Sequence, residues 1–243
     1  MIKAMHFCTR KKGTTHEECI RHHREVHAPL AKSILGPKIK RYVGHYVKQA
    51  IAQPTIAGGG ADLPFDFVAE IWLDDEVWNS MAEFHKSPDG LRIVKDEEKF
   101  IDRAKMWAVT FEDNVIVEFA GATSEPLVKT LFLDKKREGM THEECIRHHR
   151  EIHGPLVKKT FGPRIRRYVG HYVEEELSRP TIDREKTQPA YDFFPEVWFD
   201  QETWAKLKEL HGSPEFRELD REEEEFIDPK QMVAVIFEDN FIV

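Results

Sequence analysis

The chain has 243 residues, of which 33% are charged and 40% hydrophobic, and a formal net charge of −8. Its lysines and arginines are interleaved with acids, which argues against a nucleic-acid partner because such partners need a basic face. No apolar run approaches the roughly 18 residues of a membrane helix, and the N-terminus MIKAMHFCTR lacks an apolar signal-peptide core. With three cysteines, an odd number, we expect a soluble cytoplasmic protein with reduced thiols and no membrane partner.

The first half of the chain predicts the element order β-α-β-β-α-β. Residues 2–8 alternate like a strand, and Thr15 with Glu18 forms a capping box that begins a helix. Pro29 is expected to end or kink this helix close to His27. The later elements are predicted, in chain order, as strands over 39–47 and 65–73, helices over 75–85 and 88–100, a strand over 105–112, and a turn at FEDN (111–114) before a short extra strand.

The first predicted helix is rich in histidine. On a 3.6-residue period its inner face carries His16, Cys19, Ile20, His23, Val26 and His27. His22 falls on the flank, where a solvated pair with Glu18 is expected. Cys19 and its later copy Cys145 are expected to pack in the core.

The second half repeats the first at an offset of 126 residues without insertions. THEECIRHHREVHAPL at 15–30 returns as THEECIRHHREIHGPL at 141–156, and RYVGHYV at 41–47 returns at 167–173. Only His6 lacks a matching histidine, since Phe132 takes its place. A period this long indicates a duplicated domain. We therefore expect a first repeat over 1–119, a linker over 120–126 and a second repeat over 127–243.

The element order also predicts the fold. A β-α-β-β-α-β unit is the ferredoxin-like arrangement, in which helices cover one face of a four-stranded sheet. The other face stays apolar and uncovered, so the two halves are expected to pack sheet to sheet. One polypeptide would then replace a homodimer.

A helix ending in REVHAPL or REIHGPL, followed by RYVGHYV and then FDFVAEIWLDD or YDFFPEVWFDQ, resembles the EthD family of dimeric α+β barrels. The resemblance covers nearly all of both halves and implies an α+β barrel formed within one chain. Understood members include cofactor-free isomerases of muconolactone type and polyketide cyclases or dehydratases, whereas others are accessory proteins. The resemblance therefore predicts the fold more sharply than the reaction.

His27 and His153 correspond to the histidine of the family's H-G-P motif. A neutral imidazole near pH 7 can accept a proton and return it, which suits a general acid–base. The alternative is a histidine that only binds a carbonyl at the helix end. The resemblance favours the catalytic interpretation.

Two carboxylates of the third predicted strand share a face. Asp66 and Glu70 alternate with apolar residues, and their copies are Asp192 and Glu196. Buried carboxylates need partners, and we expect these among His27, His45 and Arg41. They would orient a histidine or shuttle a proton, or alternatively form ion pairs that hold the strand.

The remaining predicted site residues surround these groups. Tyr42 and Tyr168 match a family tyrosine and could donate hydrogen bonds to a substrate oxygen, or only fill the core. Gly44 suggests a bulge or space left for a ligand. The side chains predicted to contact substrate are His23, His149, His45, His171, Trp72 and Trp198.

A metal site is the alternative for the inner histidines. Residues i and i+4 on a helix can ligate a divalent ion, and the spacing fits His23 with His27 and His149 with His153. No C-x-x-C or H-E-x-x-H pattern accompanies them. His85 and His211 are instead expected to stabilise a helix end.

The leading hypothesis is a lyase or isomerase that needs no cofactor and uses histidine and carboxylate acid–base catalysis. Each half would bind a small aromatic, lactone or polyketide-like substrate between its sheet and its helices. One alternative is a metal- or oxygen-dependent enzyme of monooxygenase type in the same barrel. The other is a non-catalytic accessory protein that binds a small molecule. A homodimer of the whole chain is also compatible with the sequence.

Overall fold

The computed structural model describes residues 1–54, 59–118 and 126–243. The predicted linker, 120–126, therefore lies outside the described residues apart from its last position. In the first half the elements are β1 (Ile2–Cys8), α1 (His16–His22), η1 (His23–His27), α2 (Ala28–Leu35), η2 (Gly36–Lys38), β2 (Ile39–Ala52), β3 (Phe67–Leu73), α3 (Asp75–Phe84), α4 (Pro88–Phe100) and β4 (Trp107–Val117). In the second half they are β5 (Leu127–Leu133), α5 (His142–His148), η3 (His149–His153), α6 (Gly154–Phe161), η4 (Gly162–Arg164), β6 (Ile165–Ser178), β7 (Glu185–Thr187), β8 (Phe193–Asp200), α7 (Gln201–Ala205), α8 (Leu207–His211), α9 (Arg217–Phe226) and β9 (Val233–Phe241).

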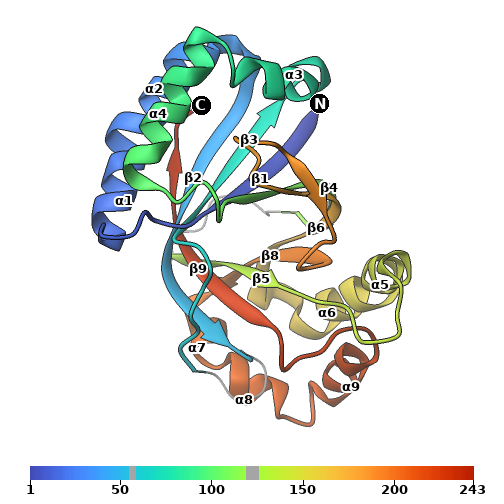
Figure 1. Cartoon of the computed structure of the whole chain (residues 1–243). Coiled ribbons are helices and arrows are strands. Elements are labelled where there is room, and N and C mark those ends of the chain that lie inside the picture. Colours follow the sequence, from blue (N-terminus) through green and yellow to red (C-terminus); the bar gives the residue numbers. More distant parts are fainter. Residues whose placement is uncertain (55–58, 119–125) are drawn as a thin grey trace.

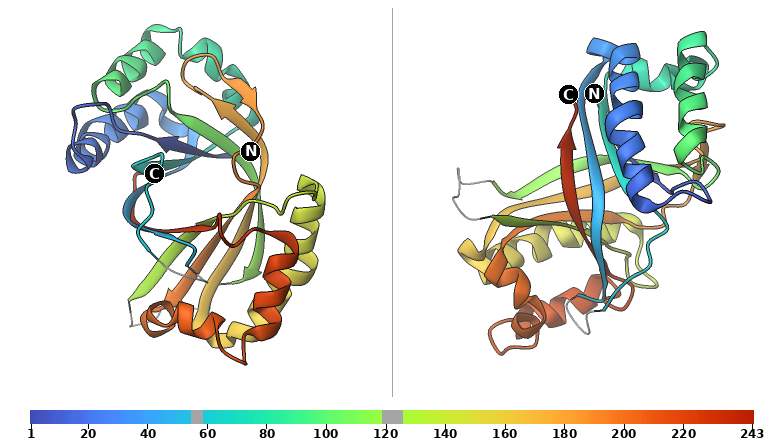
Figure 2. Two further views of the ribbon diagram at one scale, coloured as in Figure 1. Left: turned by 60° about the horizontal axis from the view of Figure 1, so that its bottom comes forward. Right: turned by 90° about the vertical axis from the view of Figure 1, so that its left-hand side faces the viewer.

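Eight of the described strands close into one antiparallel barrel. Their order is β4-β1-β3-β2-β9-β5-β8-β6, and β6 pairs back onto β4, while the short β7 adds to the outer edge of β6. Each half contributes four neighbouring strands. The halves are therefore joined through the β2–β9 and β4–β6 pairs, so that the end of each half completes the sheet of the other (Figure 2).

The helices of the two halves lie on opposite sides of this barrel (Figure 1). Three apolar cores result. One fills the barrel interior and combines residues of both halves, including Phe7, Val68, Leu133 and Phe194. The other two lie between the sheet and the helices of each half. The predicted α+β barrel within one chain is confirmed, and among the described residues no helix is long and apolar enough to cross a membrane.

The first helix differs from the predicted one at its centre. Residues His23–His27 form a π-turn, in which the N–H of Ala28 bonds the carbonyl of His23, five residues earlier. Pro29 does not end the helix, because the wider turn accommodates a residue without an N–H donor. Helix α2 therefore continues to Leu35. The same turn rotates Val26 outwards, so that it is 45% exposed. The expectation that Val26 faces inwards was wrong.

The expected turn at FEDN is also wrong. Strand β4 runs through this segment, where Glu112, Asp113 and Asn114 pair with β6 of the other half. The strand continues because the second half offers it an edge that a single half does not contain. The matching segment in β9 pairs with β2 in the same way.

Candidate active site

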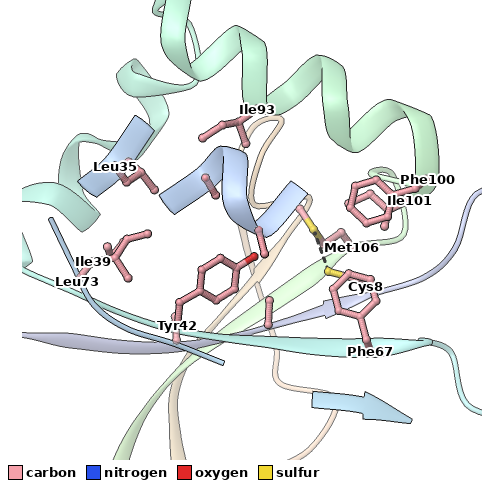
Figure 3. Packing of buried hydrophobic residues seen from close by; sticks show 14 of the residues in the cluster. Cys8, Leu35, Ile39, Tyr42, Phe67, Leu73, Ile93, Phe100, Ile101 and Met106 are labelled. Atoms are coloured by element: carbon pink, nitrogen blue, oxygen red, sulfur yellow. Dashed lines mark hydrogen bonds between the residues drawn. The ribbon is translucent and has the colours of Figure 1, made fainter. Parts of the chain in front are cut away.

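Each half contains a cavity between its sheet and its helices. The first has a water-accessible volume of about 70 Å³, and the second has one of about 50 Å³. Both exceed the roughly 10–15 Å³ that one water molecule needs. Figure 3 shows the apolar layer around the first cavity, with Tyr42 directed from the sheet towards the helices. Apolar walls of the first cavity include Leu35, Phe67, Ala69, Ile71, Trp78, Ile93 and Phe100.

His27 reaches the first cavity with one nitrogen held by a carboxylate. Its ring is 8% exposed and lines the cavity, and its Nδ1 lies 3.1 Å from Oδ2 of Asp96 on α4. The second half repeats this pair, with Nδ1 of His153 2.6 Å from Oε2 of Glu222 on α9. In the described part of the chain, Nε2 of either ring makes no hydrogen bond. A histidine–carboxylate dyad therefore lies at both cavities.

Asp96 is held in its ionised form. Burial opposes ionisation, but hydrogen bonds from His27, Lys99 and His22 outweigh it and lower the pKa of the carboxyl well below its usual value. An ionised carboxylate only accepts hydrogen bonds. Nδ1 of His27 must therefore carry the proton, which leaves the lone pair of the neutral ring on Nε2.

The π-turn brings a second histidine to the same carboxylate. Nε2 of His22 lies 3.2 Å from Oδ1 of Asp96, and the ring stacks on Phe100. The copy His148 bonds Glu222 at 2.6 Å. The predicted solvated pair of His22 with Glu18 was wrong, because Glu18 closes the capping box on Thr15.

Tyr42 is fixed by a chain of buried hydrogen bonds. Nε2 of His23 lies 2.9 Å from the hydroxyl of Tyr42, and Nδ1 lies 2.9 Å from the hydroxyl of Tyr46. His149 bonds Tyr168 and Tyr172 in the same way, at 2.7 and 2.9 Å. Burial and the neighbouring His27 lower the pKa of His23 well below its usual value, and burial raises that of Tyr42. His23 and Tyr42 are therefore both neutral.

An asparagine from the other half adds a further hydrogen bond to this chain. Nδ2 of Asn240 donates to the hydroxyl oxygen of Tyr46, and Nδ2 of Asn114 donates to that of Tyr172 at 3.1 Å. The hydroxyl of Tyr46 can still donate to Nδ1 of His23, and in that tautomer Nε2–H of His23 donates to the hydroxyl oxygen of Tyr42. The hydroxyl proton of Tyr42 is left for the cavity.

Gly44 makes room for this arrangement. A Cβ at this position would lie 2.9 Å from the hydroxyl of Tyr46 and 3.2 Å from Cε1 of His23. Gly170 stands in the same relation to His149 and Tyr172. The space predicted at Gly44 is therefore taken by the protein's own side chains.

The strand carboxylates do not reach the cavities. Oε2 of Glu70 lies 2.9 Å from Nε2 of His45, and Oε1 lies 2.9 Å from Nε of Arg41. Two of the expected partners of Glu70 are thus confirmed, but His27 is not among them. In its strand Glu70 alternates with Ala69 and Ile71, which line the cavity, so its side chain points to the barrel side.

The other predicted carboxylates have similar structural partners. Asp66 bonds Nδ1 of His16 at 2.9 Å and also Arg10, and Asp192 bonds Nδ1 of His142 at 2.8 Å. Glu196 pairs with Lys129 at 3.1 Å. The helix histidine His16 also bonds the carbonyl of Val47, so it joins the helix to the sheet. None of these carboxylates orients His27 or His153.

His45 belongs to a charged network inside the barrel that joins the halves. Its Nδ1 lies 2.6 Å from Asp239 of the second half, and Asp239 also pairs with Lys129 at 2.8 Å. Burial and Lys129 oppose protonation of His45, but the carboxylates of Asp239 and Glu70 outweigh them and raise its pKa. His171 pairs with Asp113 at 2.6 Å. His45 and His171 therefore lie on the barrel side of the sheet and line neither cavity.

The two strand tryptophans are also outside the cavities. Trp72 lies under the ammonium of Lys3 and the guanidinium of Arg41, and Trp198 lies under Lys129. They share the barrel side with Glu70 and Glu196 because side chains alternate along a strand. The tryptophan that does line the first cavity is Trp78 of α3.

The geometry disfavours the metal site considered for the inner histidines. Both ring nitrogens of His23 and of His149 bond tyrosine hydroxyls, and one nitrogen of His27 and of His153 bonds a carboxylate. Over the described ranges, no group of three or more His, Cys, Asp or Glu side chains is arranged to hold a metal ion.

The cysteines pack as predicted, and the helix-end histidines differ between the halves. Cys19 and Cys145 are fully buried, and burial raises the pKa of Cys19 to about 12. His85 follows the last turn of α3 and lines the first cavity. His211 bonds Asp220 at 2.8 Å.

Sequence reasoning missed the carboxylates that hold the catalytic candidates. Asp96 and Glu222 occupy matched positions on buried faces of α4 and α9. They differ in identity, so a search for identical pairs passes over them. An acid at both positions, next to the identical pair Glu97 and Glu223, was the available signal.

The fold and its two equivalent cavities define a tandem α+β barrel protein. The EthD domain family matches residues 11–104 and 137–230. The chain therefore belongs to the EthD family, with one EthD domain in each half. A search of curated proteins finds no match.

Solved structures that are similar to this chain are distant from it in sequence. A protein of Fusobacterium nucleatum subsp. nucleatum ATCC 25586, described as a "Putative monooxygenase", has 8% sequence identity and a TM-score of 0.51, covering 99% of this chain and 93% of its own. A protein of Lactobacillus acidophilus NCFM with the same description has 12% identity and a TM-score of 0.45, covering 99% and 94%. The first of these likenesses supports the fold alone.

Proposed function

We propose that this protein is a cofactor-independent lyase or isomerase that abstracts a carbon-bound proton from a small aromatic, lactone or polyketide-like substrate. The observation that carries the proposal is the hydrogen bond between Nδ1 of His27 and Asp96 at the wall of an apolar cavity, repeated by His153 and Glu222. It supports a general base whose tautomer is set by the protein.

His27 would take the proton with Nε2. Asp96 fixes the ring orientation and stabilises the imidazolium that forms, as a carboxylate does in other histidine-based sites. General base catalysis of this kind contributes about 10²–10⁴-fold to a rate. The imidazolium then returns the proton to another carbon in an isomerisation, or to the leaving group in an elimination.

Tyr42 would stabilise the oxygen on which negative charge develops. Burial keeps its hydroxyl neutral, and the chain through His23 and Tyr46 leaves its proton directed away from His23. A donor that is already oriented costs no reorganisation when the enolate forms. His23, which also lines the first cavity, would thus position Tyr42.

The walls suggest the kind of substrate. Phe67, Trp78 and Phe100 supply flat apolar surfaces around the base. A conjugated or aromatic substrate delocalises the charge left by proton loss, so histidine and tyrosine suffice without a cofactor. The order β4-β1-β3-β2 with helices on one face also leads us to assign each half as a ferredoxin-like repeat.

Proton exchange tests the proposal before the substrate is known. Lactones, β-diketones and hydroxyaromatic ketones are incubated with the protein in D₂O, and loss of the acidic C–H signal is followed by NMR. We expect the protein to accelerate exchange for at least one probe class, and His27→Gln with His153→Gln to abolish the acceleration. Exchange that persists at the wild-type rate in the double variant contradicts the proposal.

A further inference from the structure

The first cavity has one wall that comes from the second half of the chain. Thr181 and Arg184, between β6 and β7, line it together with the residues of the first half. Arg103 fixes this segment by donating to the side chain and carbonyl of Thr181, and it also pairs with Glu97 at 3.0 Å. The position of Arg184 is therefore determined by contacts between the halves.

Arg184 presents an uncommitted positive charge at this cavity. Its guanidinium lies 4.4 Å from the ring centroid of Trp78. The guanidinium has no hydrogen bond or ion pair within the described part of the chain, and the nearby Glu175 pairs with Lys186. A guanidinium that stacks on an aromatic ring keeps its in-plane N–H groups free to bind a carboxylate at two points.

The groups around Arg184 leave this end of the cavity without a competing anion. Burial and the charge of Arg184 lower the pKa of His6 to about 3 and that of His85 to about 4, so both rings are neutral. The buried Nδ1 of His6 has no partner among the described residues. The cavity carboxyl group, Glu97, already pairs with Arg103. A cationic donor and an unpaired ring nitrogen thus face the same space.

The second cavity differs at the equivalent positions. Phe132 replaces His6, and Asp134 replaces Cys8. Asp134 is 4% exposed, its Oδ1 has no hydrogen-bond partner among the described residues, and burial together with Glu223 raises its pKa. Position 58, which matches Arg184, is a glycine outside the described residues. The second cavity therefore has a phenyl ring and a buried acid at the positions where the first has His6 and Cys8.

We propose that the first cavity binds a ligand that carries a carboxylate, that Arg184 of the second half pairs with this carboxylate, and that the second cavity does not bind it. The proposal assigns carboxylates as the substrate class of the first cavity. It rests on the proposed function only for the reaction that follows binding. The arginine is a specificity residue supplied by one EthD domain to the cavity of the other.

Matched probes of equal shape test the proposal. Benzoate and 4-hydroxybenzoate are titrated into the full chain by calorimetry, in parallel with benzamide and 4-hydroxybenzamide, and Trp fluorescence serves as a second readout because Trp78 lies under Arg184. The variants are Arg184→Gln, which removes the charge, and Arg184→Lys, which keeps it. Lys206→Ala is the control, since it removes an exposed positive charge of the second half whose partner is the exposed Glu202.

We expect one carboxylate probe to bind per chain, at least tenfold more tightly than its amide. Arg184→Gln should remove that preference, Arg184→Lys should restore part of it, and Lys206→Ala should leave it unchanged. Equal binding of acid and amide, two equivalent sites, no binding of any carboxylate probe, or a preference that survives Arg184→Gln overturns the proposal. Arg184-dependent binding without any C–H exchange in D₂O leaves this inference standing and refutes the proposed function instead.

Discussion

Nδ1 of His27 and Oδ2 of Asp96 lie 3.1 Å apart, although 69 residues separate them in the chain. The contact forms because the π-turn at the end of α1 directs His27 towards α4. An α-helix would place residues 22 and 27 on different faces, whereas a wider turn brings both to one carboxylate. The local irregularity of the helix is thus the feature that builds the dyad.

Asp96→Asn tests the dyad while keeping the shape of the side chain. An amide can donate to Nδ1 of His27 and favours the tautomer whose Nε2 carries the proton, so the base loses its lone pair in the cavity. We expect exchange or turnover at the first cavity to fall by about 10²-fold or more, with a lowering of the melting temperature too small to explain it. Asp89→Asn, on the exposed face of the same helix, should change neither.

Tyr42→Phe and Tyr46→Phe separate donation from positioning. Loss of the Tyr42 hydroxyl should lower kcat about 10–100-fold, because an oriented donor to the developing enolate is removed. Loss of the Tyr46 hydroxyl leaves Nδ1 of His23 buried without its partner, which should lower the free energy of unfolding by about 1–3 kcal/mol. For both variants, steady-state kinetics measures the effect on kcat and urea unfolding measures the effect on the free energy of unfolding. Equal kinetic effects of the two substitutions would argue against the direct role of Tyr42.

Gly44→Ala tests the space that the Tyr–His–Tyr chain requires. The added methyl group would lie 2.9 Å from the hydroxyl of Tyr46, so the buried chain has to shift. We expect a loss of about 1–3 kcal/mol of unfolding free energy. Gly60→Ala is the control, because no heavy atom lies within 4 Å of the position that its added methyl group would take. Similar melting temperatures for the two variants would contradict the account.

The charged network in the barrel is expected to contribute most to stability in mildly acidic solution. Burial opposes ionisation of Asp239 and Glu70, but bonds from His45 lower both pKa values, to about 2 for Asp239. Their contribution is present above about pH 4.5 and is lost as the pH falls, by about 2 kcal/mol for Asp239. The pKa of His45 is raised above 6.5, so its contribution is present below that pH and is lost as the pH rises.

Urea unfolding at pH 3, 5.5 and 8.5 checks this prediction. The wild-type chain should lose stability between pH 5.5 and pH 3. His45→Gln should lose more stability at pH 5.5 than at pH 8.5, since only the protonated ring bonds two carboxylates. His171→Gln removes one carboxylate bond and should cost less at pH 5.5. A His45→Gln effect that is the same at both pH values would rule out the charged network as its source.

Much of the fold could be predicted because local chemistry determines it. The capping box at Thr15 and Glu18 begins α1 as expected, and the strand pattern of residues 2–8 gives β1. The continuation of β4 through FEDN could not be read locally, because its partner strand belongs to the other half. When the edge strand that extends a sheet comes from a distant part of the chain, the sequence around the extended strand carries no pattern that predicts the pairing.

The site was predicted in part for the same reason. The inward position of His27 followed from helical spacing. Strand alternation showed that Asp66, Glu70 and Trp72 lie together, but not whether their face meets the helices or the barrel interior. Arg184 escaped notice because it reaches the cavity from a segment of the other half.

The protonation state of the His27 ring tests the central claim most directly, and it needs no substrate. ¹⁵N NMR of the histidine side chains, recorded at a pH where the imidazole is neutral, distinguishes the two tautomers. We expect Nδ1 of His27 to carry the proton and Nε2 to be unprotonated in the wild-type chain, with the reverse in Asp96→Asn. A proton on Nε2 of His27 in the neutral wild-type ring would contradict the account, because the cavity would then contain no base.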